Sequence, residues 1–257
     1  MIKPLRLSAI LLIAGCCWIA KIQAKEEIFA IPTTKFDAQK TKSQEAVTII
    51  ANGHFDGDEN LLERYKDSYI IAVDGGLNYC YKAKVIPDKI VGDLDSVNRK
   101  ILEKFTHVET LLLPHDKDVT DLEAALNLVD FSKTKKVILL AALGGRIDHC
   151  LGNLVLLTRF PGKVFIETEK ELVFAVNGTT GKTNMPCFQG QTISLVPLNG
   201  PASGIQTEGL KWELKNGTLD KNFIGISNEC LQDTFSLSLE KGDLLCIINK
   251  GEVNSSQ

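Results

Sequence analysis

The sequence lacks the patterns that mark several common classes of protein. It contains no Lys/Arg cluster, and its 29 basic and 32 acidic residues give a formal net charge of −3, which argues against a nucleic-acid partner. Its seven cysteines include no C-x-x-C pair, and such an unpatterned, odd-numbered set predicts reduced thiols in a core, not a disulfide framework or a zinc site. The 257 residues, 44% of them hydrophobic, suffice for one large or two modest globular domains.

A membrane-spanning run is missing as well, because the apolar segment at residues 7–20 is too short to cross a bilayer comfortably. Its length and the basic residues before it are typical of a secretion signal. Within it, the tetrapeptide that ends at Cys16 resembles a bacterial lipoprotein processing site. We interpret residues 1–24 as a signal-like or mis-assigned N-terminal segment and residues 25–45 as a solvated linker. Export, or lipid anchoring through Cys16, is an alternative to the cytoplasmic location expected below.

Residues 46–165 alternate short apolar runs with stretches of helical spacing. Apolar, β-rich runs lie at 46–51, 69–73, 89–91, 108–113 and 136–143, and helices are expected at 58–66, 96–105, 121–131 and 148–160. Continuously apolar strands that alternate with helices predict a parallel sheet covered by helices on both faces. We therefore expect an α/β domain over residues 46–165.

After about Lys163 the pattern changes to short strands separated by turn residues. Strands are predicted at 164–168, 172–177, 191–196, 210–214, 234–239 and 244–248. Within residues 234–239, apolar residues alternate with Thr and Ser, as in a strand that is buried on one face. No stretch has convincing helical spacing, so residues 166–252 predict an all-β domain, either a sandwich or a partial barrel.

Polar motifs follow several of the predicted parallel strands, where ligands of open α/β sheets bind. One of them places Asp93 and Asp95 two residues apart, directly after a buried strand. In an extended chain, residues i and i+2 point the same way, so both carboxylates would face one spot. Because like charges so close together repel, the pair requires a cation between them. Mg²⁺, which takes oxygen ligands and often bridges to phosphate, satisfies that requirement.

Two further motifs lie near predicted strand ends. Residues 116–121 hold three carboxylates at the start of a helix, and their mutual repulsion predicts a metal or a cationic substrate nearby. Thr120 and Glu123 form a capping box there. After the 136–143 strand, two glycines would let the backbone approach a ligand closely, and Arg146 supplies a guanidinium that suits phosphate oxygens. His54, His107 and His115 belong to no motif.

The ordered set of motifs resembles the thiamine pyrophosphokinase family over about residues 46–250. The matching segments are Asn52-Gly53, Asp74-Gly75-Gly76, Gly92-Asp93-Leu94-Asp95-Ser96, Asp118-x-Thr120-Asp121, Gly144-Gly145-Arg146-x-Asp148-His149, Gly209-Leu210-Lys211-Trp212-x-Leu214 and Ser227-Asn228. Each motif alone is weak evidence for this resemblance, whereas the whole set in this order is specific to the family. Some family members carry a lysine at the position of Ala124, and in this chain Lys117 could supply a charge nearby instead.

The resemblance implies an ATP-dependent diphosphotransferase. Such an enzyme, a thiamine diphosphokinase, transfers a pyrophosphoryl group from ATP to the hydroxyethyl oxygen of thiamine and yields thiamine diphosphate and AMP. The resemblance also implies a Rossmann-like, ATP-binding domain at 46–165, a thiamine-binding β-sandwich at 166–252, and a homodimer with sites between subunits. Because ATP is a cytoplasmic substrate, we expect a cytoplasmic location.

The same resemblance implies roles for individual residues. Asp93, Asp95 and Asp121 would hold Mg²⁺ and, with Arg146, form the catalytic set. The residues expected at the nucleotide are Asn52, Asp74, Lys117, Asp118, Thr120, Arg146, Asp148 and His149. The residues expected at thiamine are Trp212, Ser227 and Asn228, although a tryptophan in a strand region is also an ordinary core residue. Which carboxylate accepts the proton of the attacking alcohol is left open.

Two other classes of function are weighed against this interpretation. A metal-dependent glycosyltransferase also uses Asp-x-Asp after a strand, but it would not account for the 118–121 motif or for Trp212. An exported thiamine- or nucleotide-binding lipoprotein would explain residues 1–24 and the β domain. It would leave the carboxylates without a role.

Overall fold

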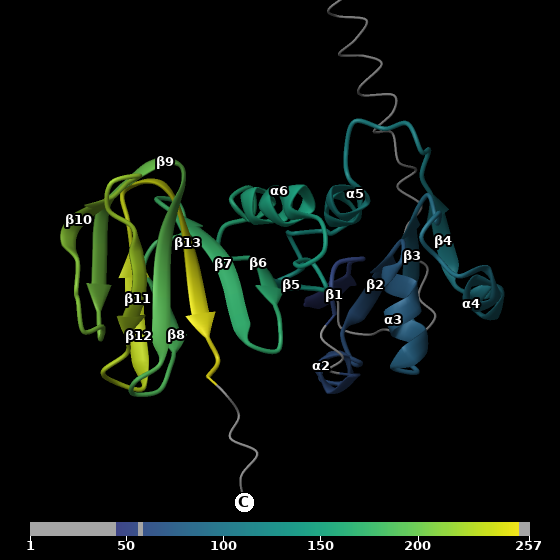
Figure 1. Ribbon diagram of the computed structural model, residues 1–257, viewed down its shortest axis with the longest axis horizontal. Coiled ribbons are helices and arrows are strands. Elements are labelled where there is room, and N and C mark those ends of the chain that lie inside the picture. The colour runs from purple at the N-terminus through teal and green to yellow at the C-terminus, as the bar shows by residue number, and fades with distance from the viewer. Residues whose placement is uncertain (1–44, 56–58, 252–257) are drawn as a thin grey trace, which may run out of the picture. The chain divides into compact units, whose positions relative to one another are not determined.

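One continuous sheet of thirteen strands runs through the part of the chain that the structure describes (Figure 1). The structure is a computed structural model, and it describes residues 45–55 and 59–251. The predictions made for residues 1–24 and for the linker up to residue 44 lie outside the described residues. The described residues all belong to one unit of the fold, Lys42–Gln257.

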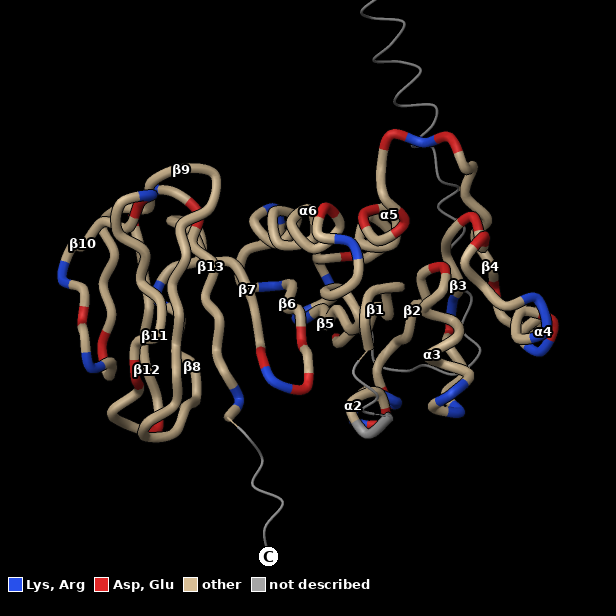
Figure 2. The backbone as a smooth tube through the Cα atoms, viewed as in Figure 1, with Lys and Arg blue, Asp and Glu red and all other residues tan. Residues whose placement is uncertain are grey.

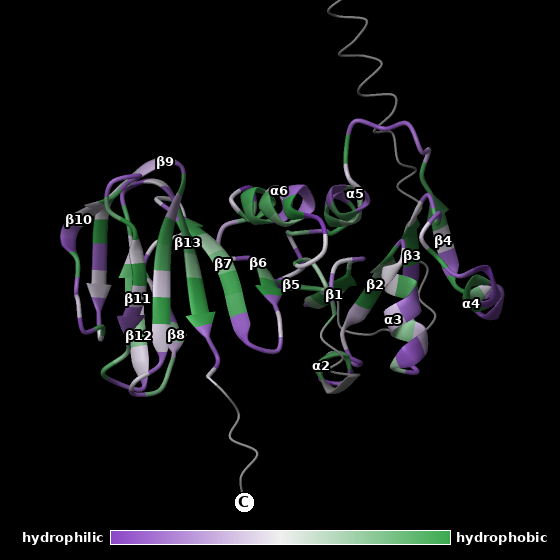
Figure 3. Ribbon diagram, viewed as in Figure 1, coloured by the Kyte–Doolittle hydropathy of each residue, from purple (hydrophilic) through white to green (hydrophobic). Residues whose placement is uncertain are grey.

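The first half of the sheet is parallel, as the sequence predicts. Its strands are β1 (Ala46–Ile50), β2 (Tyr69–Val73), β3 (Lys89–Gly92), β4 (Glu109–Leu112), β5 (Lys136–Leu140) and β6 (Val164–Glu167). They lie in the order β4-β3-β2-β1-β5-β6, and every neighbouring pair is parallel. Figure 3 shows the inner strands as hydrophobic, which agrees with the almost complete burial of β1, β2, β3 and β5.

Helices cover both faces of this parallel half. They are α2 (Glu59–Glu63), α3 (Gly76–Lys82), α4 (Arg99–Leu102) with the 3-10 turn η1 (Glu103–Phe105), α5 (Asp121–Asn127) and α6 (Ile147–Leu157). Leu126 of α5 and Leu157 of α6 pack in one core cluster, whereas Leu62 of α2 and Leu77 of α3 pack in another. No helix in residues 45–55 and 59–251 is long and apolar enough to cross a membrane.

The second half of the sheet is antiparallel. Its strands are β7 (Glu171–Asn177), β8 (Thr183–Pro186), β9 (Thr192–Glu208), β10 (Lys215–Leu219), β11 (Gly225–Glu229), β12 (Thr234–Ser238) and β13 (Lys241–Asn249). The antiparallel β6–β7 pair joins the two halves. The strand predicted at 210–214 is wrong, because Leu210 makes only an isolated bridge to Cys230. The segment instead connects β9 to β10. Strand β10 was not predicted from the sequence pattern.

The prediction that the cysteines are reduced thiols is wrong for two of them. Cys187 and Cys230, 43 residues apart, form a disulfide, whereas Cys80, Cys150 and Cys246 are free. The pairing follows from the fold. Strand β8 pairs with β12, and Cys187 then donates its backbone N–H to the carbonyl of Asp233, in the connection that follows Cys230. No sequence motif marks such a contact between distant segments.

Candidate active site

The candidate site lies where the strand order of the parallel half changes direction. Strands β2, β3 and β4 follow on one side of β1, and β5 and β6 lie on its other side. Ligands of open α/β sheets bind beyond the strand ends at such a switch point. Beyond β1 and β5 the two chain segments stay together, because Gly53 donates its N–H to the Ala141 carbonyl at 2.7 Å. A cavity of about 560 Å³ opens beside them.

Most of the residues predicted for catalysis and nucleotide binding line this cavity. They are Asn52, Asp74, Asp93, Asp95, Lys117, Thr120, Asp121, Arg146 and His149. Asp118 and Asp148 do not line it, and neither do Trp212, Ser227 or Asn228. The cavity is also lined by residues for which the sequence analysis gave no role, namely Ser96, His115 and Asn153.

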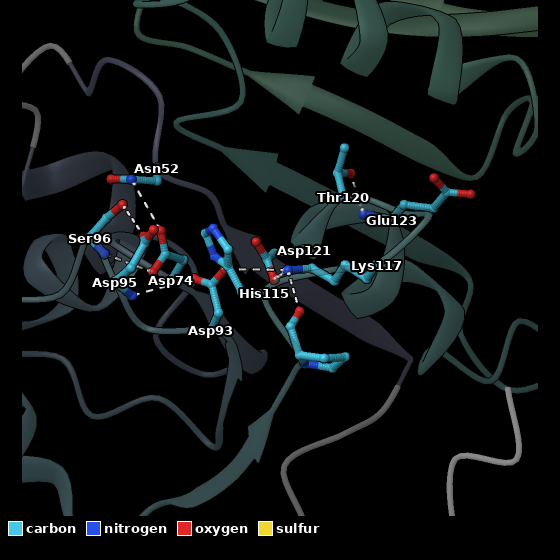
Figure 4. Close-up of polar contacts among 11 residues, drawn as sticks. Asn52, Asp74, Asp93, Asp95, Ser96, His115, Lys117, Thr120, Asp121 and Glu123 are labelled. Carbon is cyan, nitrogen blue, oxygen red and sulfur yellow. Dashed lines mark hydrogen bonds and ion pairs between the residues drawn. The ribbon is translucent and has the colours of Figure 1, made fainter. Parts of the chain in front are cut away.

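Asp74 follows β2 directly and is a buried residue of the cavity lining. It is 8% exposed, and its carboxylate accepts hydrogen bonds from the Asn52 amide and the Ser96 backbone N–H, both at 3.4 Å (Figure 4). A Cβ on the next residue, Gly75, would lie 2.0 Å from Asn52 Oδ1, so any other residue there would displace the Asn52 side chain. The Asp-Gly-Gly motif therefore fixes both Asp74 and Asn52 at the cavity.

The Asp93–Asp95 segment is a tight turn and not the extended chain that the sequence analysis assumed. Leu94 has a φ of 64°, and Asp93 Oδ1 accepts the Asp95 backbone N–H at 3.4 Å. The two carboxylates still come together, but through the turn. Serine often caps a helix, but the cap of the following helix is not Ser96; it is Asn98, whose side chain accepts from the Lys100 N–H.

Two side chains from the segment after β4 reach the Asp93 carboxylate. His115 Nδ1 lies 2.9 Å from Asp93 Oδ2, and Lys117 Nζ lies 3.4 Å from the same oxygen. Lys117 Nζ also lies 3.2 Å from Asp121 Oδ1, so its ammonium group sits between the two carboxylates (Figure 4). The hydrogen bond with His115 lowers the pKa of Asp93, whereas burial raises the pKa of Asp121 in spite of Lys117. Lys117 thus supplies a positive charge to Asp93 and Asp121 from within the chain.

The oxygen-rich donor set at this edge fits a divalent cation. Figure 2 shows acidic residues both in the segment after β3 and in the segment that leads to α5. Asp93, Asp95 and His115 offer ligand atoms that all lie within 4.8 Å of one another. Carboxylate oxygens are the ligands of Mg²⁺ and Mn²⁺, and imidazole adds affinity for transition metals. Asp121, the third predicted ligand, is not in this group and pairs with Lys117.

The start of α5 confirms one half of the predicted capping box. Thr120 Oγ1 accepts the backbone N–H of Glu123 at 3.1 Å, which satisfies a free donor of the first helical turn. The Glu123 carboxylate does not return to the Thr120 backbone and pairs with Arg159 of the segment after α6. The cap fixes where the helix begins and so holds Asp121 against Lys117.

Arg146 and Asp148 form an exposed pair at the start of α6. The guanidinium donates two hydrogen bonds to Asp148, at 3.1 and 2.6 Å, and these lower the pKa of the carboxylate to about 2. The Arg146 side chain is 74% exposed. Asn153 of α6 donates to the Ala142 carbonyl at 2.7 Å, which ties this helix to the end of β5.

The residues predicted for the second substrate form a separate exposed cluster. Trp212 is 58% exposed, so it is not an ordinary core tryptophan. The Asn228 amide accepts the Trp212 N–H at 3.1 Å and donates to the Trp212 carbonyl at 2.8 Å, which fixes the Trp212 backbone. The Lys211 ammonium lies 5.0 Å from the centre of the indole ring. Ser227, with a φ of 59°, donates its N–H to Ser194 Oγ.

Two domain models of one family match the chain. The model described as thiamin pyrophosphokinase, catalytic domain, matches residues 61–168, which include the cavity residues from Asp74 to Asn153. The model described as thiamin pyrophosphokinase, vitamin B1 binding domain, matches residues 182–244, which include Trp212 and Asn228. The boundary between the two matches falls within the antiparallel β6–β7 region of the sheet.

Relatives of known name and structure agree with these matches. Thiamin pyrophosphokinase 1 of Caenorhabditis elegans is 32% identical over 187 residues, which are 66% of this chain and 74% of that protein. Thiamine pyrophosphokinase 2 of Arabidopsis thaliana is 28% identical over 172 residues, 57% of this chain, and the chain spans 64% of the length of that relative. The crystal structure of thiamine pyrophosphokinase from Bacillus subtilis has the same fold, with a TM-score of 0.70 at 24% identity over 80% of this chain and 99% of that chain. The chain therefore belongs to the thiamine pyrophosphokinase family.

Proposed function

We propose that the chain is a thiamine diphosphokinase, which transfers the pyrophosphoryl group of ATP to the hydroxyethyl oxygen of thiamine and releases AMP. The observation that carries the proposal is the cavity at the switch point of the sheet, where Asp93, Asp95 and Lys117 converge in a chain of this family. Residues 46–165 form its Rossmann-like ATP-binding domain, and residues 166–252 form its thiamine-binding β-sandwich. The domain matches at 61–168 and 182–244 support this division.

Phosphoryl transfer needs mainly positioning and neutralisation of charge. When bound at Asp93 and Asp95, Mg²⁺ supplies charge neutralisation at the phosphates. Lys117, whose side chain is 11% exposed, holds its ammonium group at the cavity through Asp93 and Asp121. Arg146 presents a guanidinium whose planar fork matches phosphate oxygens. A carboxylate at the cavity accepts the proton that the thiamine hydroxyl loses.

The nucleotide end of the cavity is shaped by the residues that follow β1, β2 and β5. Asn52 and Asp74 offer an amide and a carboxylate for the nucleoside, and their positions are set by the hydrogen bond between them. Gly144 and Gly145 line the same cavity and let a phosphate approach the backbone. Asp118 and Asp148 do not line the cavity. Asp148 holds the Arg146 guanidinium in place through two hydrogen bonds.

We propose that the working form is a homodimer. Trp212, Ser227 and Asn228 do not line the cavity that holds the carboxylates, so the thiamine-binding cluster of one copy would complete the cavity of the other. Exposed apolar side chains support an interface on both halves of the chain. They are Ile147, Leu151 and Val155 on α6, and Phe223, Ile224 and Ile226 around β11. Sedimentation equilibrium at micromolar concentration tests this proposal, and a monomer that turns over would refute it.

We propose a cytoplasmic location because the phosphoryl donor, ATP, is a cytoplasmic metabolite. The Cys187–Cys230 disulfide weighs against it, since disulfides persist mainly in oxidising compartments. Trapping thiols with an alkylating reagent in intact cells decides between a cytoplasmic location and export. Alkylation of both cysteines would agree with the cytoplasm, and their protection would indicate export.

A ligand screen by thermal shift separates the proposed function from the two rival classes. For a thiamine diphosphokinase, we expect ATP with Mg²⁺, and thiamine, each to raise the melting temperature, because a ligand of the folded state stabilises it. A sugar nucleotide with Mn²⁺ should not. A response to the sugar nucleotide would favour a glycosyltransferase, and a response to thiamine alone, with none to ATP, would favour a binding protein.

A further inference from the structure

We propose that the Cys187–Cys230 disulfide is a reversible redox switch for thiamine binding, in which the oxidised form holds Trp212 in place and reduction weakens the affinity for thiamine. The inference rests on the proposed function, which places thiamine at the cluster of Trp212, Ser227 and Asn228. A bond that forms reversibly also agrees with the proposed cytoplasmic location, because disulfides in that compartment are usually transient or redox-sensing.

Cys230 belongs to the short ladder of backbone contacts that positions Trp212. The segment that ends at Trp212 pairs with residues 228–231. Within this ladder Leu210 makes an antiparallel bridge to Cys230, and backbone hydrogen bonds of 2.9 Å flank the bridge on both sides. At the end of the ladder the Asn228 amide accepts the Trp212 N–H and donates to the Trp212 carbonyl. Order at Cys230 is therefore passed directly to the tryptophan.

The disulfide ties this ladder to the edge of the sheet. Cys187 follows β8, which ends the strand order of the sheet and pairs with β12 (Figure 1). The turn after Cys187 also meets the ladder, because Cys230 donates its N–H to the Gln191 carbonyl at 2.9 Å and accepts the Gly190 N–H at 2.8 Å. Reduction removes the covalent link and leaves these two hydrogen bonds, so the turn and the ladder gain conformational freedom.

The two sulfur atoms differ in their access to a reductant. Cys187 is half-buried and Cys230 is fully buried, so a small thiol such as glutathione attacks the Cys187 sulfur. The S–S bond breaks, a mixed disulfide forms at Cys187, and Cys230 leaves as a thiolate that takes up a proton. A second glutathione thiolate then attacks the mixed disulfide, which releases Cys187 as a thiol and forms glutathione disulfide. The two glutathione molecules supply the two electrons and two protons, and the reverse sequence restores the bond.

The surroundings of Cys230 suit a free thiol as well as a disulfide. Cys230 lies in the apolar core of the antiparallel half, together with Leu210 and Phe235. A free cysteine behaves as a small hydrophobic residue, so the reduced side chain can stay in this core. Reduction should therefore loosen the ladder without unfolding the domain.

Titration of the full chain with thiamine in glutathione buffers tests the switch. We expect thiamine to bind about threefold or more weakly in excess reduced glutathione than after oxidation, because the apparent affinity falls with the fraction of molecules in the ordered form. ATP affinity should not change, since the nucleotide cavity lies in the parallel half of the sheet. Alkylation followed by mass spectrometry reports the state of the two cysteines in each sample.

The outcomes separate the switch from the proposed function. Equal thiamine affinity in the two states would overturn the switch and leave the function in place, as would a bond that excess glutathione does not reduce. Equal losses of thiamine and ATP affinity on reduction would also overturn it, because they would indicate general destabilisation. Absence of thiamine binding in both states would instead refute the proposed function.

Cys187→Ser is the matched variant, since it removes the bond and keeps Cys230 as the thiol of the reduced form. We expect it to bind thiamine as weakly as the reduced wild type and not to respond to glutathione. Cys150→Ser, which removes a free cysteine, should respond as the wild type does. The switch is wrong if Cys187→Ser binds thiamine like the oxidised wild type, if it is unfolded at the assay temperature, or if Cys150→Ser loses the response.

Discussion

At the scale of the residue, Asp93 is the point where the polar contacts of the site converge. One of its carboxylate oxygens contacts both His115 and Lys117, and the other accepts the backbone N–H of Asp95. The hydrogen bond with His115 keeps its pKa low, so the group is ionised at neutral pH. A charge held in this way is suited to hold a cation beside the phosphates of a nucleotide.

Asp93→Asn tests that role. The substitution keeps the size of the side chain and removes the charge, so we expect turnover to fall by on the order of 10²-fold or more while the melting temperature stays close to that of the wild type. Asp116→Asn is the matched control, because Asp116 is exposed and does not line the cavity. A variant that keeps near-full activity at limiting Mg²⁺ would remove Asp93 from the metal site.

A second prediction at this scale concerns Trp212 and the binding of thiamine. Its exposed indole can stack on the cationic thiazolium ring, an attraction of about 0.5–2 kcal/mol. We expect Trp212→Ala to weaken thiamine binding by about tenfold, or about 1.4 kcal/mol, with little change in ATP affinity. Tyr81→Ala, which removes an exposed aromatic ring that does not line the cavity, should change neither affinity. Equal losses of thiamine and ATP affinity in Trp212→Ala would make the tryptophan a structural residue.

At the scale of the element, the turn between β2 and α3 positions Asn52 by close packing. Gly75 has ordinary helical angles, with a φ of −56°, so alanine is strained there only by contact with Asn52. We expect Gly75→Ala to lower the free energy of unfolding by about 1–3 kcal/mol and to weaken ATP binding, because Asn52 must move. Urea unfolding and ATP titration measure the two effects.

Gly152→Ala is the control for that substitution. A Cβ at Gly152, within α6, would meet nothing within 4 Å. Since alanine favours a helix over glycine by up to about 1 kcal/mol, this variant should be at least as stable as the wild type. A Gly75→Ala variant that behaves in the same way, with unchanged ATP affinity, would show that Asn52 is not held by packing.

The disulfide fixes the end of β8 to the end of β11, in the antiparallel half of the sheet. Cross-links of this kind stabilise a fold by about 2–4 kcal/mol, chiefly by restricting the unfolded chain. We expect dithiothreitol to lower the free energy of unfolding of the wild type by about this amount. The double variant Cys187→Ser, Cys230→Ser should not respond to the reductant. Identical unfolding curves with and without dithiothreitol would show that the bond does not form in solution.

Elements with strong hydrophobic periodicity, or with a clear capping or turn residue at their ends, could be predicted from the sequence. The buried parallel strands, the Thr120 cap and the approach of Asp93 and Asp121 to one cavity are examples, since each depends on residues close in sequence or on strand ends that must meet. Helix α3 could not be predicted, because it starts at Gly76 without a capping side chain. His115 and the disulfide were missed for another reason. Both depend on strand pairing between distant segments, which leaves no local pattern.

At the scale of the whole molecule, one hydrogen-bonded sheet joins the region that holds the carboxylates to the region that holds Trp212. The two regions match the catalytic and the vitamin B1 binding models of one family, as the proposed transfer from ATP to thiamine requires. The central claim is that these parts act on the two substrates in one reaction.

The measurement that tests this claim most directly is the release of AMP from ATP with and without thiamine, in the presence of Mg²⁺. We expect AMP and thiamine diphosphate to appear in equal amounts when thiamine is present, and no AMP when it is absent. Release of ADP in place of AMP, or AMP formation that does not depend on thiamine, would contradict the proposed function.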